Sequence, residues 1–446
     1  MGESMAQEVG LLRKLAEHLE RRPPPLKRLT QALLRMQGLG HVHETAGGMT
    51  AIRMPGQYAF TELTNCLLDR LPAMERGAIY ADVQTELFDF IESYVGREPS
   101  TIGNQEAEAL VAHFANWFAG KSQSRRVFVP CIISRIPASR FEIGPVTFEF
   151  IDNIPNGDFY PHGGESPTWT WRAMDDLIHW MREGQADWLA RVAVDGCERG
   201  RAEEIGELAV DLAIVSLQLS APYHDTRTMA RLDARRGTTK KRTLSEANGS
   251  YRGSWTIKEP GMVIGAGALT AILQERAPIF AAVGNVVRSF ASGSFRLPGL
   301  ERAWCDAAYW LHQALAESID SIAIAKLETA LEVLLRVESS KGSTKRMLEV
   351  LDAFFNLEPD DPVVKGSLLS AQQFARNVVR DRSRILHGTW STLNARGIDR
   401  AGMEGFAITV IGEAALHIEE YAHSTGAADD INEFLGWVKQ RKSSKV

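Results

Sequence analysis

RNVVRDRSRILHGTW (Arg376–Trp390) has the pattern of a helix with an unusual distribution of charge. It holds four arginines, at positions 376, 380, 382 and 384, and it ends in a histidine followed by a glycine. A buried helix avoids so many cations, and a surface helix normally intersperses acids that pair with them. Within this stretch Asp381 is the one acid. The arginines therefore face either water or an anionic partner.

The helical period places these residues around the axis. At about 100° per residue, Arg380 and His387 nearly eclipse each other, and Arg384 lies within one turn of His387. Arg382 lies about 140° around from His387, so the two converge only if the helix end unwinds or a second chain shares the cleft. Gly388 permits close approach of another backbone. The side expected to be buried consists of Phe374, Val378, Val379, Ile385 and Leu386.

A histidine beside several fixed cations is suited to the cleavage of RNA. In that reaction the 2′-hydroxyl attacks the adjacent phosphate, which requires proton transfers and a cation for the developing phosphorane charge. Histidine titrates near neutrality and can move the protons, while arginine aims planar, charged donors at phosphate oxygens. This chemistry needs no metal. The alternative is a helix-terminal histidine with solvated arginines, and spacing alone leaves it open.

Two segments resemble a known family. RSRILHG (382–388) resembles the R-x4-6-H motif of HEPN domains, and its form Arg-Ser-x-x-x-His-Gly resembles in particular the ApeA-like HEPN group. The upstream ETALEVLL (328–335) is similar to an Ala-Leu-Glu-x-Leu-Leu segment of that group. The resemblance covers about residues 300–425 and extends loosely to the β-rich segment at 127–150.

The resemblance implies a metal-independent and cofactor-independent endoribonuclease whose site forms between two HEPN protomers. Arg382 and His387 would be the paired catalytic residues, and Ser383 would fill the polar position after the arginine. Arg380 also satisfies the spacing and is the second candidate, with Arg384 in support. Glu332 would match the helix glutamate that orients the motif; the alternative is an exposed helix acid.

The same resemblance implies partners and a setting. The family is associated with abortive-infection immunity against phage, in which the enzyme cleaves RNA, tRNA among it, after a phage-derived trigger. A homodimer through the C-terminal helical domain would complete the site. Residues 1–265 would sense the trigger or restrain the nuclease. Two alternatives stay open: a HEPN module that binds RNA or nucleotide without cleaving it, and an interaction protein whose helices serve only to oligomerise.

A second basic segment runs from Arg227 to Arg242, with seven cations against one acid. It is interpreted either as a solvated, partly disordered loop or as a surface that tracks phosphates. Together with Arg376 of the first stretch, the candidate RNA-binding residues are Arg235, Arg236, Lys240, Lys241 and Arg242.

Composition excludes several classes of protein. The 446 residues carry a net charge of −6, so the whole chain is not a polycation that binds nucleic acid by bulk electrostatics. Four cysteines are scattered without a CxxC pair, which argues against a zinc knuckle or a disulfide framework. We find neither a signal peptide nor a run of about 18 apolar residues, so we expect a cytoplasmic protein without a membrane span.

Two short motifs suggest other sites but lack the required context. ANWFAGKS (115–122) satisfies a relaxed phosphate-loop pattern, yet an amphipathic helix precedes it where a strand is needed, so a helix end capped at Gly120 is expected. HVHE (41–44) has no third metal ligand at a sensible spacing and is interpreted as surface histidines in a loop.

The hydrophobic patterns predict an α+β, predominantly helical fold. We expect a helical region at 1–122, a β-containing region at 123–265 that forms one unit with it, and a HEPN-type helical bundle at 266–446. Strands are expected at 126–136, 146–151 and 254–265, and helices at 171–195 and 202–219. The apolar stripes of the bundle are Trp304/Ala308/Leu311/Leu315, Leu327/Leu331/Leu334/Leu335, Met347/Leu351/Phe354/Phe355 and Phe406/Val410/Ala414/Ile418.

Overall fold

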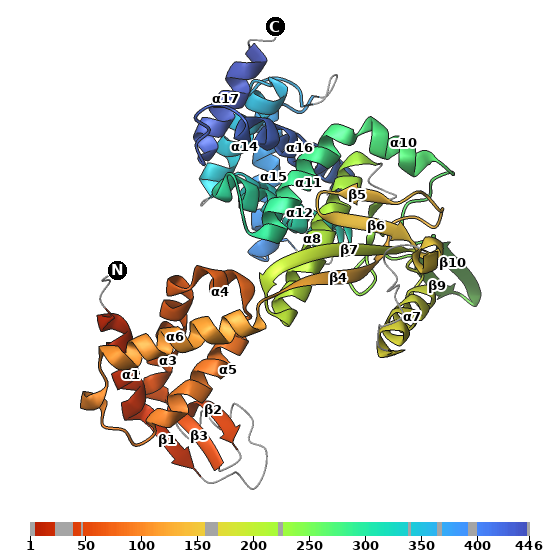
Figure 1. The fold of residues 1–446 in the computed structure, drawn as a ribbon. Helices are drawn as coiled ribbons and strands as arrows, with labels where there is room; N and C mark the ends of the chain where they lie inside the picture. The colour runs from red at the N-terminus through yellow and green to blue at the C-terminus, as the bar shows by residue number, and fades with distance from the viewer. Residues whose placement is uncertain are drawn as a thin grey trace. The chain divides into compact units, whose positions relative to one another are not determined.

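A computed structural model describes residues 5–22, 39–45, 48–156, 168–221, 226–337, 340–363, 368–390 and 399–443. The fold is α+β and mostly helical, with small sheets that contain antiparallel strand pairs (Figure 1). The chain forms two compact units, residues 1–125 with 194–204 and residues 126–193 with 205–446. Most of the β-containing region therefore groups with the C-terminal helices and not, as expected, with residues 1–122.

The first unit combines helices with a three-stranded antiparallel sheet of order β1-β3-β2, and its core is formed mainly by helical residues. Strands β2 and β3 pair antiparallel, and HVHE lies in strand β2 rather than in a loop. Helix α6 runs past Gly120 to Lys121, so the expected cap at Gly120 is wrong, while the helix itself is confirmed. The elements are α1 (Ala6–His18), β1 (Leu19–Arg22), β2 (Leu39–Thr45), β3 (Gly48–Arg53), α3 (Met54–Arg70), α4 (Pro72–Gly77), α5 (Tyr80–Ile91) and α6 (Asn104–Lys121).

A five-stranded sheet of order β5-β6-β7-β4-β8 belongs mainly to the second unit. Strand β6 confirms the strand expected at 146–151. Its alternation of Val146, Phe148 and Phe150 with polar residues is typical of a half-buried strand, yet Thr147 and Glu149 are buried as well, so both faces are buried. Gly144, at φ +59°, lies so close to Gly284 that a Cβ on either glycine would collide with the other backbone. The strands are β4 (Gln123–Ile132), β5 (Phe141–Ile143), β6 (Val146–Phe150), β7 (Trp188–Cys197) and β8 (Ala230–Arg231).

The helix expected at 171–195 is partly wrong. Helix α7 covers Thr168–Glu183, and the chain then enters strand β7. The alternate residues Trp188, Ala190, Val192 and Val194 are all fully buried, which is the period of two of a strand. Helix α8 (Arg199–Ser220) confirms the expectation at 202–219.

From residue 268 onward the regular structure is helical, as expected. The stripe on α12 and the stripe on α13 with its C-cap Leu335 are entirely buried, and those on α14 and α16 are buried except for Phe355 and Phe406, which are half-buried. None of the described helices is long and apolar enough to cross a membrane. The helices are α10 (Ala268–Glu275), α11 (Ala277–Ser292), α12 (Pro298–Leu315), α13 (Asp320–Leu334), α14 (Ser340–Phe355), α15 (Ala371–Leu386), α16 (Arg400–Ala422) and α17 (Ile431–Ser443).

The strand pair expected at 254–265 is built differently. Strands β9 (Lys240–Ala247) and β10 (Ser250–Ile257) form an antiparallel hairpin that turns at Asn248 and Gly249, both at positive φ. Asn-Gly is the preferred pair for such a two-residue turn. The Pro-Gly at 260–261 lies after β10 and joins no strand pair.

Candidate functional site

Helix α15 holds the arginine-rich stretch, and its two ends have clear causes. At the start, the hydroxyl of Ser370 accepts the backbone N–H of Gln373, whose side chain reaches back to the N-cap. At the end, His387 is the C-cap, and Gly388 follows at φ +70°. This left-handed conformation favours glycine, so the His-Gly pair stops the helix. His387 thereby lies at an exposed helix end.

The arginines of α15 have different environments. Arg376 is exposed, Arg380 forms an ion pair with the neighbouring Asp381 at 3.0 Å, and Arg384 lies over the ring of Trp390 at 5.0 Å. Arg382 is half-buried instead. Leu386 is exposed, so the buried side of the helix is narrower than expected.

Arg382 is anchored to a neighbouring helix. Its guanidinium forms an ion pair with Glu332 of α13, and Glu332 also accepts a hydrogen bond from the hydroxyl of Ser343 on α14 at 2.5 Å. Glu332 is therefore not an exposed helix acid. Three helices, α13, α14 and α15, converge on the Glu332 carboxylate. The ion pair orients Arg382, the first candidate among the arginines.

A second glutamate beside this pair was not singled out from the sequence. Glu328 is fully buried, and among the described residues neither of its carboxyl oxygens has a hydrogen-bond partner. Burial raises the pKa of Glu328 to about 9; the charge of Arg382 opposes the rise, and the charges of Glu332 and Asp381 add to it. The sequence offered one signal for Glu328: it lies four residues before Glu332, and residues four apart share one face of a helix.

Replacing Glu328 by glutamine is expected to stabilise the fold at neutral and alkaline pH. The folded carboxyl keeps a proton that the unfolded chain loses above its ordinary pKa of 4.5, so the stability of the wild type falls as pH rises from about 4.5 toward 9. At pH 7 the deficit is on the order of 3 kcal/mol. An amide has no proton to lose, so Glu328→Gln should remove this fall.

Urea midpoints at pH 5, 7 and 9 would measure the effect, with the exposed Glu275→Gln as a matched control. Midpoints of wild type and Glu328→Gln that stay parallel across this range would show that Glu328 is not held as a neutral acid.

Arg382 and His387 do not form a hydrogen bond or ion pair with each other in the described chain. The first is turned toward α13, whereas the second is exposed at the helix end. Ser383 is half-buried, and its carbonyl accepts the backbone N–H of His387 at 2.9 Å. One chain thus presents the two predicted catalytic residues without bringing them together.

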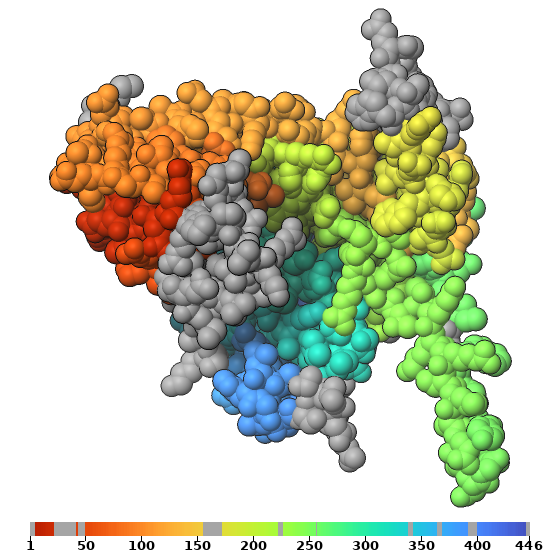
Figure 2. Space-filling view, turned by 90° about the horizontal axis from the view of Figure 1, so that it is seen from below, coloured from red at the N-terminus to blue at the C-terminus, as the bar shows by residue number. Residues whose placement is uncertain are grey.

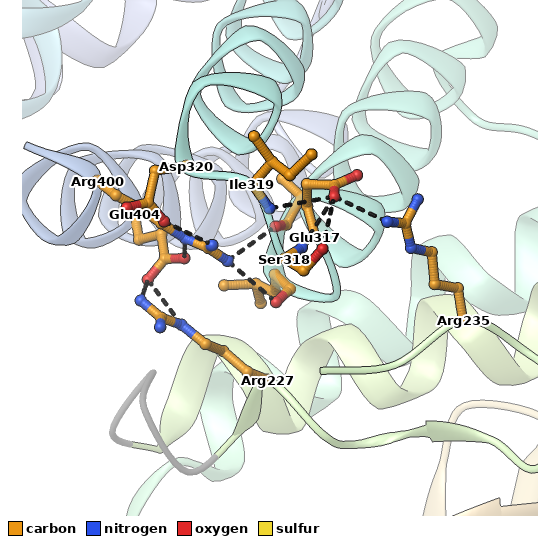
Figure 3. Close-up of polar contacts among 10 residues, drawn as sticks. Arg227, Arg235, Glu317, Ser318, Ile319, Asp320, Arg400 and Glu404 are labelled. Atoms are coloured by element: carbon orange, nitrogen blue, oxygen red, sulfur yellow. Dashed lines mark hydrogen bonds and ion pairs between the residues drawn. The ribbon is translucent and has the colours of Figure 1, made fainter. Parts of the chain in front are cut away.

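The basic segment at 227–242 divides into two parts. Arg227, Arg231 and Arg235 all form ion pairs with acids of the same unit, and Arg235 meets the buried Glu317 at 2.8 Å (Figure 3). Arg236 is half-buried and donates to the carbonyl of Leu232. By contrast, the remaining candidates, Lys240, Lys241 and Arg242, are exposed on β9.

The internal pairs form a network centred on Glu404 of α16 (Figure 3). This carboxylate is fully buried and meets the guanidinium of Arg400 at 2.7 Å and that of Arg227 at 2.6 Å. Arg400 also meets Asp320 at 3.1 Å and donates to the carbonyls that end α12. These contacts tie the segment after α8 to three helices, which is a structural role.

The described ranges contain no group of three histidine, cysteine or acidic side chains arranged to hold a metal ion. A cavity of about 860 Å³ is lined by residues of α13 to α16 and their connections, including Asp381 but neither Arg382 nor His387.

Comparison with known proteins adds no relative. No protein-family model, no curated protein and no solved structure matches this chain.

Proposed function

We propose that this chain is a metal-independent endoribonuclease of the ApeA-like HEPN kind. The supporting observation is the anchoring of Arg382 by Glu332 on the adjacent helix, with Arg382 on the same helix whose end exposes His387. This is the arrangement that an arginine–histidine site needs if a second protomer completes it. By the resemblance, the enzyme acts as a cytoplasmic homodimer in antiphage defence, with tRNA among its candidate substrates.

The proposed reaction is an internal transesterification of RNA. The 2′-oxygen forms a bond to the adjacent phosphorus, and the bond from phosphorus to the 5′-oxygen breaks. One His387 takes the proton of the 2′-hydroxyl, and the His387 of a second copy gives a proton to the departing 5′-oxygen. The products are a 2′,3′-cyclic phosphate and a 5′-hydroxyl end.

Arg382 would stabilise the charge of the phosphorane. A guanidinium has five N–H donors in a fixed fork, so its pairing with Glu332 orients the group and leaves other donors for phosphate oxygens. Orientation before the reaction matters because a preorganised donor needs no rearrangement when the charge develops. Glu332 is accordingly a positioning residue.

The direct test incubates the purified full-length chain with total RNA in EDTA and maps the new ends by sequencing. Metal-independent cleavage with 2′,3′-cyclic phosphate and 5′-hydroxyl ends is expected. The full chain is required, because the second compact unit spans 126–193 and 205–446 and a C-terminal fragment would divide it. The dimeric, folded protein is to be isolated from producing cells with and without phage infection. If it cuts no RNA in either case, the ribonuclease proposal is wrong, and the alternative of a module that binds RNA without cleaving it remains.

Arg382→Ala and Arg380→Ala separate the two candidate arginines. Loss of Arg382 is expected to lower the cleavage rate by about 10²- to 10³-fold, as for removal of a preorganised donor. Arg380 is its matched control, since it is exposed and, among the described residues, pairs with the adjacent acid alone, and its loss should change the rate by less than about 10-fold. Single-turnover rates on a defined RNA would measure both. A larger loss for Arg380→Ala would assign the catalytic role to that residue instead.

A further inference from the structure

The β9–β10 hairpin is a second feature of the chain that needs an explanation. It forms a two-stranded sheet of its own, and it projects from the surface in Figure 2. Its large apolar side chains lie in solvent: Trp255 is 76% exposed, and Leu244, Tyr251 and Ile257 are exposed to a similar degree. An isolated hairpin with exposed apolar residues is unfavourable in water, so we expect this surface to bind a partner.

The strand register decides which side chains share a face. Arg242 pairs with Trp255, and Lys240 pairs with Ile257. Residues directly opposite each other project to the same side, and alternate residues along a strand share that side. One face, here called the aromatic face, therefore holds Lys240, Arg242, Leu244, Glu246, Tyr251, Trp255 and Ile257. The opposite face is polar and holds Lys241, Thr243, Ser245, Arg252 and Ser254.

The charge of the hairpin is opposite to that of the chain. Residues 240–257 contain four cations and one acid, whereas the whole chain has a net charge of −6. No ion pair to these four cations occurs among the residues that the structure describes, in contrast to Arg227, Arg231 and Arg235. The acid, Glu246, accepts the backbone N–H of Gly249 at the turn. The free positive charge of this segment is thus concentrated beside exposed aromatic rings.

We propose that the aromatic face of the β9–β10 hairpin binds single-stranded RNA, with bases stacking on Trp255 and Tyr251 and phosphates pairing with Lys240 and Arg242. Exposed aromatic rings interleaved with cations are the elements by which single strands are held without reading their sequence. The inference rests on the proposed ribonuclease for its purpose, which is to hold the substrate, but binding can be tested separately from cleavage.

Two other occupants fit the same face less well. A second copy of this chain would bring two positively charged hairpins together, and lysines on an exposed strand oppose strand addition. A protein partner would bury the aromatic rings, but lysine is depleted in protein interfaces. Lys240 and Lys241 therefore favour a polyanion over either of them.

The test measures RNA binding by the full-length chain carrying His387→Ala, so that the RNA stays intact. Fluorescence anisotropy would follow a labelled mixed-sequence 16-nucleotide RNA, with the same sequence as a duplex in a second arm. Adding Trp255→Ala is expected to weaken binding by roughly 5- to 150-fold, the effect of losing one stacked base. Trp180→Ala is the matched control, because Trp180 is an exposed tryptophan of α7, and it should leave the Kd unchanged.

A charge variant gives an independent readout. Lys240→Gln with Arg242→Gln should weaken binding and also reduce the slope of log K against log salt by about 1.4, since each contact to a single strand contributes about 0.7. Equal Kd values for Trp255→Ala and Trp180→Ala, tighter binding of the duplex, or a changed oligomeric state without a changed Kd would each overturn the inference. If wild type cleaves RNA while hairpin variants bind it normally, the inference fails and the proposed function stands. If binding depends on the hairpin but the chain never cleaves RNA, the inference about binding stands and the proposed function fails.

Discussion

His387→Ala is expected to lower the rate of RNA cleavage by about 10²- to 10⁴-fold, the usual contribution of a general acid or base. The histidine lies at an exposed helix end, and its backbone N–H, which alanine retains, makes the contact that closes the last turn of α15. Removing its imidazole should therefore cost little stability. A loss of activity in a folded protein would report on proton transfer rather than on the fold.

The chain supplies a matched control for this variant. His423 is also an exposed histidine at the C-cap of a long helix, α16, but no arginine motif precedes it. His423→Ala should cleave RNA at the wild-type rate. Single-turnover assays in EDTA would compare the three proteins at equal concentration, with dimer content checked by light scattering. Similar rates for wild type and His387→Ala would contradict the assignment of a catalytic role.

The sequence predicted the helical half well, because its signals are local. Stripes such as Leu327, Leu331 and Leu334 repeat at the helical period, and each is buried where the period places it. The end of α15 was also readable, since a His-Gly pair after an apolar run is a common way to stop a helix. The chemistry of α15 stays a prediction, because a single chain does not bring Arg382 and His387 into contact.

Features that depend on partners distant in sequence were not predictable. Strand β7 was taken for a helix, because its buried alternation is short and follows directly on α7. The sequence of the basic segment did not indicate that three of its arginines pair with acids elsewhere in the chain. These acids are Glu404, Asp211 and Glu317. Nor did that sequence show that the remaining cations would lie on a hairpin, although the Asn-Gly turn at 248–249 was a usable signal.

Glu404→Ala is expected to destabilise the second compact unit by about 3–5 kcal/mol. The carboxylate is fully buried and compensates two guanidinium groups, those of Arg400 and Arg227. Arg400 is itself buried, and of the partners that the described residues give it, Asp320 and backbone carbonyls remain when Glu404 is lost. An uncompensated buried charge costs far more than the pair contributes by itself. For a unit that spans residues 126–193 and 205–446 the melting temperature should fall by roughly 5–8 °C.

Asp320→Ala provides the control within the same network. Asp320 pairs with the same Arg400, but its side chain is 66% exposed, so its loss should cost no more than about 1 kcal/mol. Calorimetry of the three proteins would compare the transitions directly, and Glu404→Gln, which keeps the shape and one acceptor, should fall between the extremes. Equal melting temperatures for Glu404→Ala and Asp320→Ala would mean that water hydrates the two guanidinium groups when Glu404 is absent. In that case the segment after α8 is held by its apolar contacts, and its arginines would be available to an external anion.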